Sequence, residues 1–74
     1  MNEPTDDIKR ALIDQEIANW QNSRYVLQMR HRVQIGIGAP KEILDQIVAD
    51  LERHEKALDL LTQERTALNG EEKM

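Results

Sequence analysis

The chain has 74 residues, enough for one small domain, and a formal net charge of −4 at pH 7. It has no Cys and only two His, which excludes disulfides and thiolate metal sites and disfavours a zinc site. Aromatic residues make up 3% of the chain, apolar runs are short and no signal peptide is recognisable, so we expect a helical cytoplasmic protein without membrane association.

A long first helix is predicted from about residue 5 to residue 35, after a disordered tail at residues 1–4. Thr5 suits the N-cap, and Asp6 and Asp7 complement the helix dipole in the first turn. A core stripe with alternating spacings of three and four residues, typical of a coiled coil, comprises Ile13, Ile17, Trp20, Arg24, Leu27, His31 and Gln34.

A second stripe on this helix has the same alternating spacing. It is apolar at both ends and polar in the centre, and we call it the outer stripe: Ile8, Leu12, Gln15, Asn19, Asn22, Val26, Met29 and Val33. Asn19 and Asn22 could fix the register of a helical partner, as a polar residue does in a coiled-coil core.

The segment at residues 36–39 predicts a tight turn between two helices. Gly36 suits the left-handed position that ends a helix, Gly38 adds conformational freedom, and Pro40 suits the first position of the next helix. Because the connection is short, the two helices are expected to be antiparallel neighbours.

The second predicted helix runs from residue 40 to about residue 69, where Asn69 and Gly70 form a stop signal, and residues 70–74 are predicted to be a disordered tail. Its core stripe comprises Leu44, Ile47, Leu51, His54, Leu58, Leu61, Arg65 and Leu68. Folding about the turn should place Trp20 near His54 and Leu27 near Ile47. The predicted hairpin core is Ile13, Ile17, Trp20, Leu27, Leu44, Ile47, Leu51, His54, Leu58 and Leu61.

Several apolar residues remain outside this core. They are either scattered surface residues, which are normal, or a second interface for a homodimeric four-helix bundle, a neighbouring domain or a partner helix. We favour the second interface, formed by Ile8, Leu12, Val26, Met29, Val33, Ile43, Val48 and Leu60.

Charge is unevenly distributed along the chain. No acidic residue occurs between Glu16 and Glu42, and this interval contains the four residues of a basic tip, Arg24, Arg30, Arg32 and Lys41. One explanation is that Arg30 and Arg32 complement the dipole at the end of the first helix. The alternatives are an acidic partner, a nucleic-acid backbone, or the acidic open end of another copy, although the net negative charge and few aromatics argue against nucleic acid.

No residue set predicts catalysis or cofactor binding. Ser23 has no His at helical spacing to activate it, and His54 is expected to pack beside Trp20, with a pH-sensitive role as the alternative. The expected protein is therefore non-enzymatic and cofactor-free, and it acts through another protein or a second copy.

The turn and the start of the second helix carry a resemblance to a protein family. The two segments concerned are Val33-Gln34-Ile35-Gly36-Ile37-Gly38-Ala39-Pro40 and Ile43-Leu44-Asp45-Gln46-Ile47. They resemble the effector-associated helical hairpin modules of bacterial STAND, TIR and caspase-like signalling and conflict proteins. The chain departs from that pattern at Ile35, where an aromatic is common, and at Val48-Ala49, where acidic residues are expected.

The resemblance implies homotypic or adaptor association that brings an effector to its regulator, and it supplies no catalytic residue. The sequence thus predicts an all-α antiparallel two-helix coiled-coil hairpin, assembling into a four-helix bundle that recruits effectors in a signalling or defence assembly. The alternative is a small nucleic-acid-binding hairpin dimer that uses the basic tip.

Overall fold

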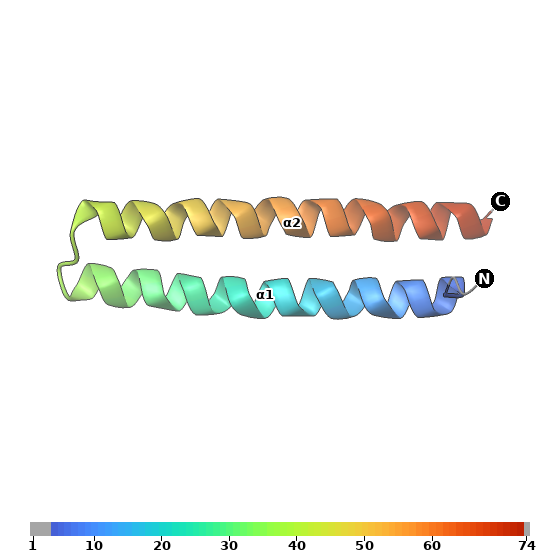
Figure 1. Ribbon diagram of the computed structural model, residues 1–74, viewed down its shortest axis with the longest axis horizontal. Coiled ribbons are helices and arrows are strands. Elements are labelled where there is room, and N and C mark those ends of the chain that lie inside the picture. Colours follow the sequence, from blue (N-terminus) through green and yellow to red (C-terminus); the bar gives the residue numbers. More distant parts are fainter. Residues whose placement is uncertain (1–3, 74) are drawn as a thin grey trace.

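The protein is an antiparallel hairpin of two long helices. The computed structural model describes residues 4–73, with side chains described for residues 4–70, so residues 1–3 and 74 of the predicted tails lie outside the described chain. Helix α1 spans Asp6–Gly36 and helix α2 spans Lys41–Lys73. They lie side by side, with the turn at one end and both outer helix ends at the other (Figure 1). The all-α hairpin predicted from the sequence is confirmed.

Thr5 caps the start of α1, as its sequence position predicted. Its backbone is extended, with φ −67° and ψ 165°, and its hydroxyl accepts the Ile8 N–H over 3.3 Å. Its carbonyl accepts the Lys9 N–H over 2.9 Å, which starts the helical hydrogen bonding. Asp6 and Asp7 follow in the first turn, where carboxylates interact favourably with the helix dipole.

Helix α1 ends in a Schellman motif centred on Gly38. The Gly38 N–H donates to the Ile35 carbonyl over 3.1 Å, and the Ala39 N–H donates to the Gln34 carbonyl over 2.9 Å. These two bonds satisfy carbonyls that the helix itself leaves free, and they require a left-handed residue at the C′ position. Gly38 supplies it with a φ of +74°.

The sequence pattern predicted the left-handed position at Gly36, and this prediction is wrong. Gly36 is the last residue of α1, and within residues 4–73 Gly38 is the one glycine with positive φ. The left-handed residue comes after Gly36 because the helical hydrogen bonding continues to Ile37, whose N–H donates to the Val33 carbonyl over 3.0 Å. Spacing alone could not distinguish two glycines that stand two residues apart.

Pro40 occupies the N-cap of α2, one residue before its predicted position. Its carbonyl accepts the N–H groups of Ile43, over 3.1 Å, and Leu44, over 3.3 Å, and α2 begins at Lys41. Proline is tolerated here because its missing N–H would have no helical partner at the start of a helix.

The predicted stop at Asn69 and Gly70 is also wrong, because α2 continues to Lys73. Gly70 does not adopt positive φ, so it forms no left-handed cap. A single glycine weakens a helix by about 1 kcal/mol relative to Ala but does not by itself end it. The backbone of residues 70–73, predicted to be a disordered tail, is therefore helical.

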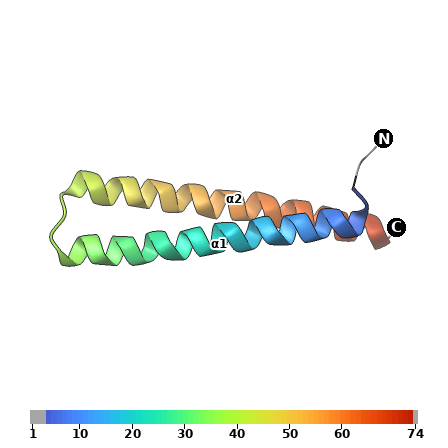
Figure 2. The same cartoon turned by 60° about the horizontal axis from the view of Figure 1, so that its bottom comes forward.

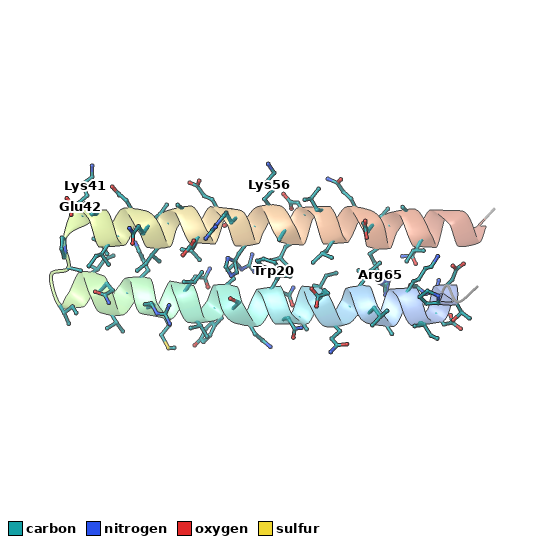
Figure 3. All side chains as sticks on the ribbon, in the orientation of Figure 1. Trp20, Lys41, Glu42, Lys56 and Arg65 are labelled. Carbon is teal, nitrogen blue, oxygen red and sulfur yellow. The ribbon has the colours of Figure 1, made fainter. Side chains whose placement is uncertain are left out.

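The two core stripes face each other along the whole hairpin. Leu27, Ile47 and Leu58 are buried, with exposed fractions of 8%, 7% and 9%. The other residues of both stripes, Arg24, His31, Gln34, Arg65 and Leu68 included, are half-buried. Figure 2 shows that the helix axes cross, and Figure 3 shows Trp20 and Arg65 on the facing sides and Lys56 pointing away from α1. A single helix pair thus leaves most of its core stripe partly exposed to water.

Candidate interaction surface

Three side chains from both helices meet at the centre of the hairpin. The rings of Trp20 and His54 form an edge-to-face contact with centroids 4.8 Å apart and an interplanar angle of 77°, as the predicted fold about the turn requires. Nε2 of His54 lies 2.8 Å from the Ser23 hydroxyl, and its Nδ1 lies 2.7 Å from the Asp50 carbonyl. Because a carbonyl only accepts, Nδ1 carries the proton, and in the neutral ring Nε2 accepts from Ser23.

Helical spacing within α1 does not predict the pairing of Ser23 with His54, because the two residues lie on different helices. The pair resembles the first two members of a nucleophilic triad. Acyl-transfer chemistry also needs free N–H donors to bind an oxyanion. The backbone N–H groups around Ser23 lie inside α1 and are used by its own hydrogen bonds. The arrangement is a polar link between the two helices.

A second polar link lies toward the open end. Arg65 donates from Nε to one oxygen of Asp14 over 2.7 Å and from a terminal nitrogen to the other over 3.2 Å. The side chain of Arg65 is 33% exposed and that of Asp14 is 54% exposed, so water screens the pair. Its two-point geometry still favours one register of α1 against α2.

The apolar residues of the outer stripe are left open to solvent on α1. Their exposed fractions are 51% for Ile8, 51% for Leu12, 42% for Val26, 43% for Met29 and 55% for Val33. In the seven-residue repeat whose a and d positions form the core stripe, the outer stripe occupies positions c and f, on the side of α1 turned away from α2. It is a continuous helix face with no intramolecular partner.

The three α2 residues of the predicted second interface do not extend this face as one surface. Ile43, Val48 and Leu60 are all exposed, at 41%, 41% and 54%. Ile43 and Leu60 directly precede core positions and lie on one flank of the hairpin, whereas Val48 directly follows a core position and lies on the other flank. Val48 therefore lies apart from the other residues of the predicted second interface, and five of the eight lie on the outer stripe of α1.

Two shallow grooves border the outer stripe on one flank. The first lies between the helices near the open end and is lined by Lys9, Leu12, Ile13, Glu64, Ala67 and Leu68. The second lies near the middle of α1 and is lined by Glu16, Asn19, Trp20 and Ser23. Each groove contains one outer-stripe residue, Leu12 or Asn19. Side chains of a helix packed on the stripe can therefore enter both grooves.

The predicted basic tip is smaller than its sequence suggested. Arg24 is half-buried in the hairpin interface, whereas Arg30, Arg32 and Lys41 are exposed. Nζ of Lys41 lies 3.9 Å from a carboxylate oxygen of Asp45. Three exposed cations thus remain at the turn, one of them paired with an acid.

The helix dipole does not account for these cations. Because α1 extends to Gly36, its last turn contains no basic residue, and Arg30 and Arg32 lie further back. The dipole effect falls off within one turn, and at the first turn of α2 it disfavours Lys41. The charge separation along the hairpin is therefore available for an intermolecular contact.

Comparison of the chain with protein-family models, with curated proteins and with solved structures gives no match. Within the described residues, no three His, Asp or Glu side chains are grouped so that they could hold a metal ion. Neither helix, as far as the structure describes it, has an apolar stretch long enough to cross a bilayer.

Proposed function

We propose that the protein is a non-enzymatic interaction module that self-associates through the outer stripe of α1. The observation that carries this proposal is the imbalance of apolar burial in the described chain. Eleven large hydrophobic residues are 41–72% exposed, whereas three are buried. Five of the exposed residues share the outer stripe, where they form an apolar patch at each end of a polar centre. Exposed apolar patches that share one helix face support a protein–protein interface.

The accessible surface area supports the same proposal. The protein exposes 5779 Å². The empirical scaling for compact monomers gives about 4,700 Å² at its mass of 8.6 kDa. The excess of roughly 1,000 Å² is similar to the area of about 800 Å² that each partner buries in a standard interface. Association of two hairpins into a four-helix bundle would bring the exposed area per chain into the ordinary range.

We also propose a biological setting for this association. The resemblance of the turn region to effector-associated hairpins supports a role in which association of copies, or of one copy with an adaptor helix, recruits an effector in a bacterial cytoplasmic signalling or defence assembly. In such a role the hairpin contributes a binding face, and the effector supplies the chemistry.

The test is to place a charge in the outer stripe. Val26→Asp should convert the assembled protein to monomer, because a carboxylate buried without a partner opposes association. Gln63→Asp is the matched control, since it adds the same charge at an exposed position on the outer side of α2. Solution mass by light scattering and helix content by circular dichroism should be measured for both variants. An unchanged mass for Val26→Asp would refute the proposed interface.

A further inference from the structure

We infer that the partner on the outer stripe is a second copy of this chain, packed antiparallel through α1 about a twofold axis that passes between Trp20 and Gln21. This inference rests on the proposed function and adds the direction and the register of the second copy. It follows from the symmetry of the stripe, the layout of charge along α1 and the position of the two grooves.

The outer stripe is symmetric about that point. Residues equally distant from the midpoint between Trp20 and Gln21 pair across the axis, and four such pairs make up the whole stripe. Three pairs match in character: Ile8 with Val33, Leu12 with Met29, and Asn19 with Asn22. The fourth, Gln15 with Val26, joins a polar residue to an apolar one. An isologous twofold contact brings these pairs together, because a residue and its mate exchange places between the two copies. Apolar side chains then meet apolar ones at both ends.

The central layer contains the four amides of the two copies. Asn19 of each copy lies opposite Asn22 of the partner subunit, and all of these side chains are exposed in the isolated hairpin. Each amide has a donor and an acceptor group, so two facing amides can satisfy each other. Shifting the register by one heptad would place an Asn against an apolar residue and leave buried amides unsatisfied. The central amides therefore select this register, as a buried Asn does in coiled coils.

The charge of α1 selects the antiparallel direction. Its first part carries Asp6, Asp7, Glu16 and the Arg65-bonded Asp14 against Lys9 and Arg10. Its remainder, from Ile17 to Gly36, carries no acid and, outside the hairpin interface, has Arg30 and Arg32 exposed. Antiparallel packing lays the acidic part of each copy along the basic part of the other. Parallel packing would set like charges together, which costs free energy at an interface.

The two grooves lie where this register needs space. Leu12 lines the first groove, and its mate is Met29, a flexible side chain suited to filling irregular gaps. Asn19 lines the second groove, and its mate is Asn22. Full overlap of the two α1 helices also follows, because the twofold axis lies near the middle of Asp6–Gly36.

The test is disulfide trapping. Because the chain has no Cys, only the introduced cysteines can form disulfides. Leu12→Cys and Met29→Cys variants are mixed in equal amounts in denaturant, refolded together, oxidised in a glutathione buffer and weighed by intact mass spectrometry. In the inferred dimer, positions 12 and 29 of opposite chains face each other. Two copies of position 12 lie about 25 Å apart at 1.5 Å per residue, beyond the reach of a disulfide.

The expected result is at least a tenfold excess of the mixed disulfide over either symmetric product, and the same preference for Ile8→Cys mixed with Val33→Cys. Gln63→Cys mixed with Met29→Cys is the control and should show no preference. Symmetric products, or a statistical mixture from a protein that is dimeric by light scattering, would overturn the antiparallel register and leave self-association standing. A monomeric mass with helical circular dichroism would overturn both.

Discussion

At the scale of single residues, the turn contains two glycines whose backbone conformations give them different roles. Gly36 and Gly38 stand two positions apart, and a Cβ added to either would meet no atom within 4 Å. They differ in backbone: Gly36 ends α1, whereas Gly38 has a φ of +74°. Side-chain crowding therefore plays no part in their substitution, and conformational free energy decides the outcome.

Gly36→Ala should raise the free energy of unfolding by about 1 kcal/mol, because Ala is the better helix former. Gly38→Ala should lower it by about 1–2 kcal/mol, because an L residue is disfavoured in the left-handed region. Urea denaturation of both variants and the parent at one protein concentration measures the difference. Effects of the same sign in the two variants would contradict the Schellman assignment.

At the scale of the elements, the core stripes were predictable from spacing. Seven residues make almost two full turns of an α-helix, so residues seven apart in the sequence lie on the same face. The predicted stripes are the residues found between α1 and α2. Links between the helices were less predictable. The bonds from Ser23 to His54 and from Asp14 to Arg65 depend on rotamers and on the exact register of packing.

A matched pair of substitutions on α2 tests the assigned core. Leu58 and Leu60 stand two positions apart, with exposed fractions of 9% and 54%. Leu58→Asp should destabilise the hairpin by at least about 3 kcal/mol, through lost apolar burial and a poorly solvated carboxylate, and Leu60→Asp by less than about 1 kcal/mol.

Thermal melts followed by circular dichroism at a fixed protein concentration would measure both effects. Because a domain this small has only a few kcal/mol of stability, Leu58→Asp should lose its cooperative transition. Equal melting curves for the two variants would contradict the assigned interface between α1 and α2.

At the scale of the whole molecule, the long thin shape leaves much of both helices exposed, which favours the proposed association with a second chain. The hairpin measures 53 × 20 × 17 Å, so each helix touches one neighbour along one face. The sequence indicated surplus apolar residues, but not that those on α2 lie on opposite flanks while those on α1 form one face. The spacing of apolar residues within one helix shows which of them share a face. Whether apolar residues of two helices share a surface depends on how the helices are rotated relative to each other, which spacing does not give.

The outer stripe of α1 is proposed to be an interface between copies of the chain. Light scattering across a concentration series from micromolar to millimolar tests it most directly. We expect a mass of about twice 8.6 kDa that persists on dilution until the dimer dissociates, with a melting temperature that rises with concentration. A mass of 8.6 kDa throughout the series, with a concentration-independent melting temperature, would contradict it.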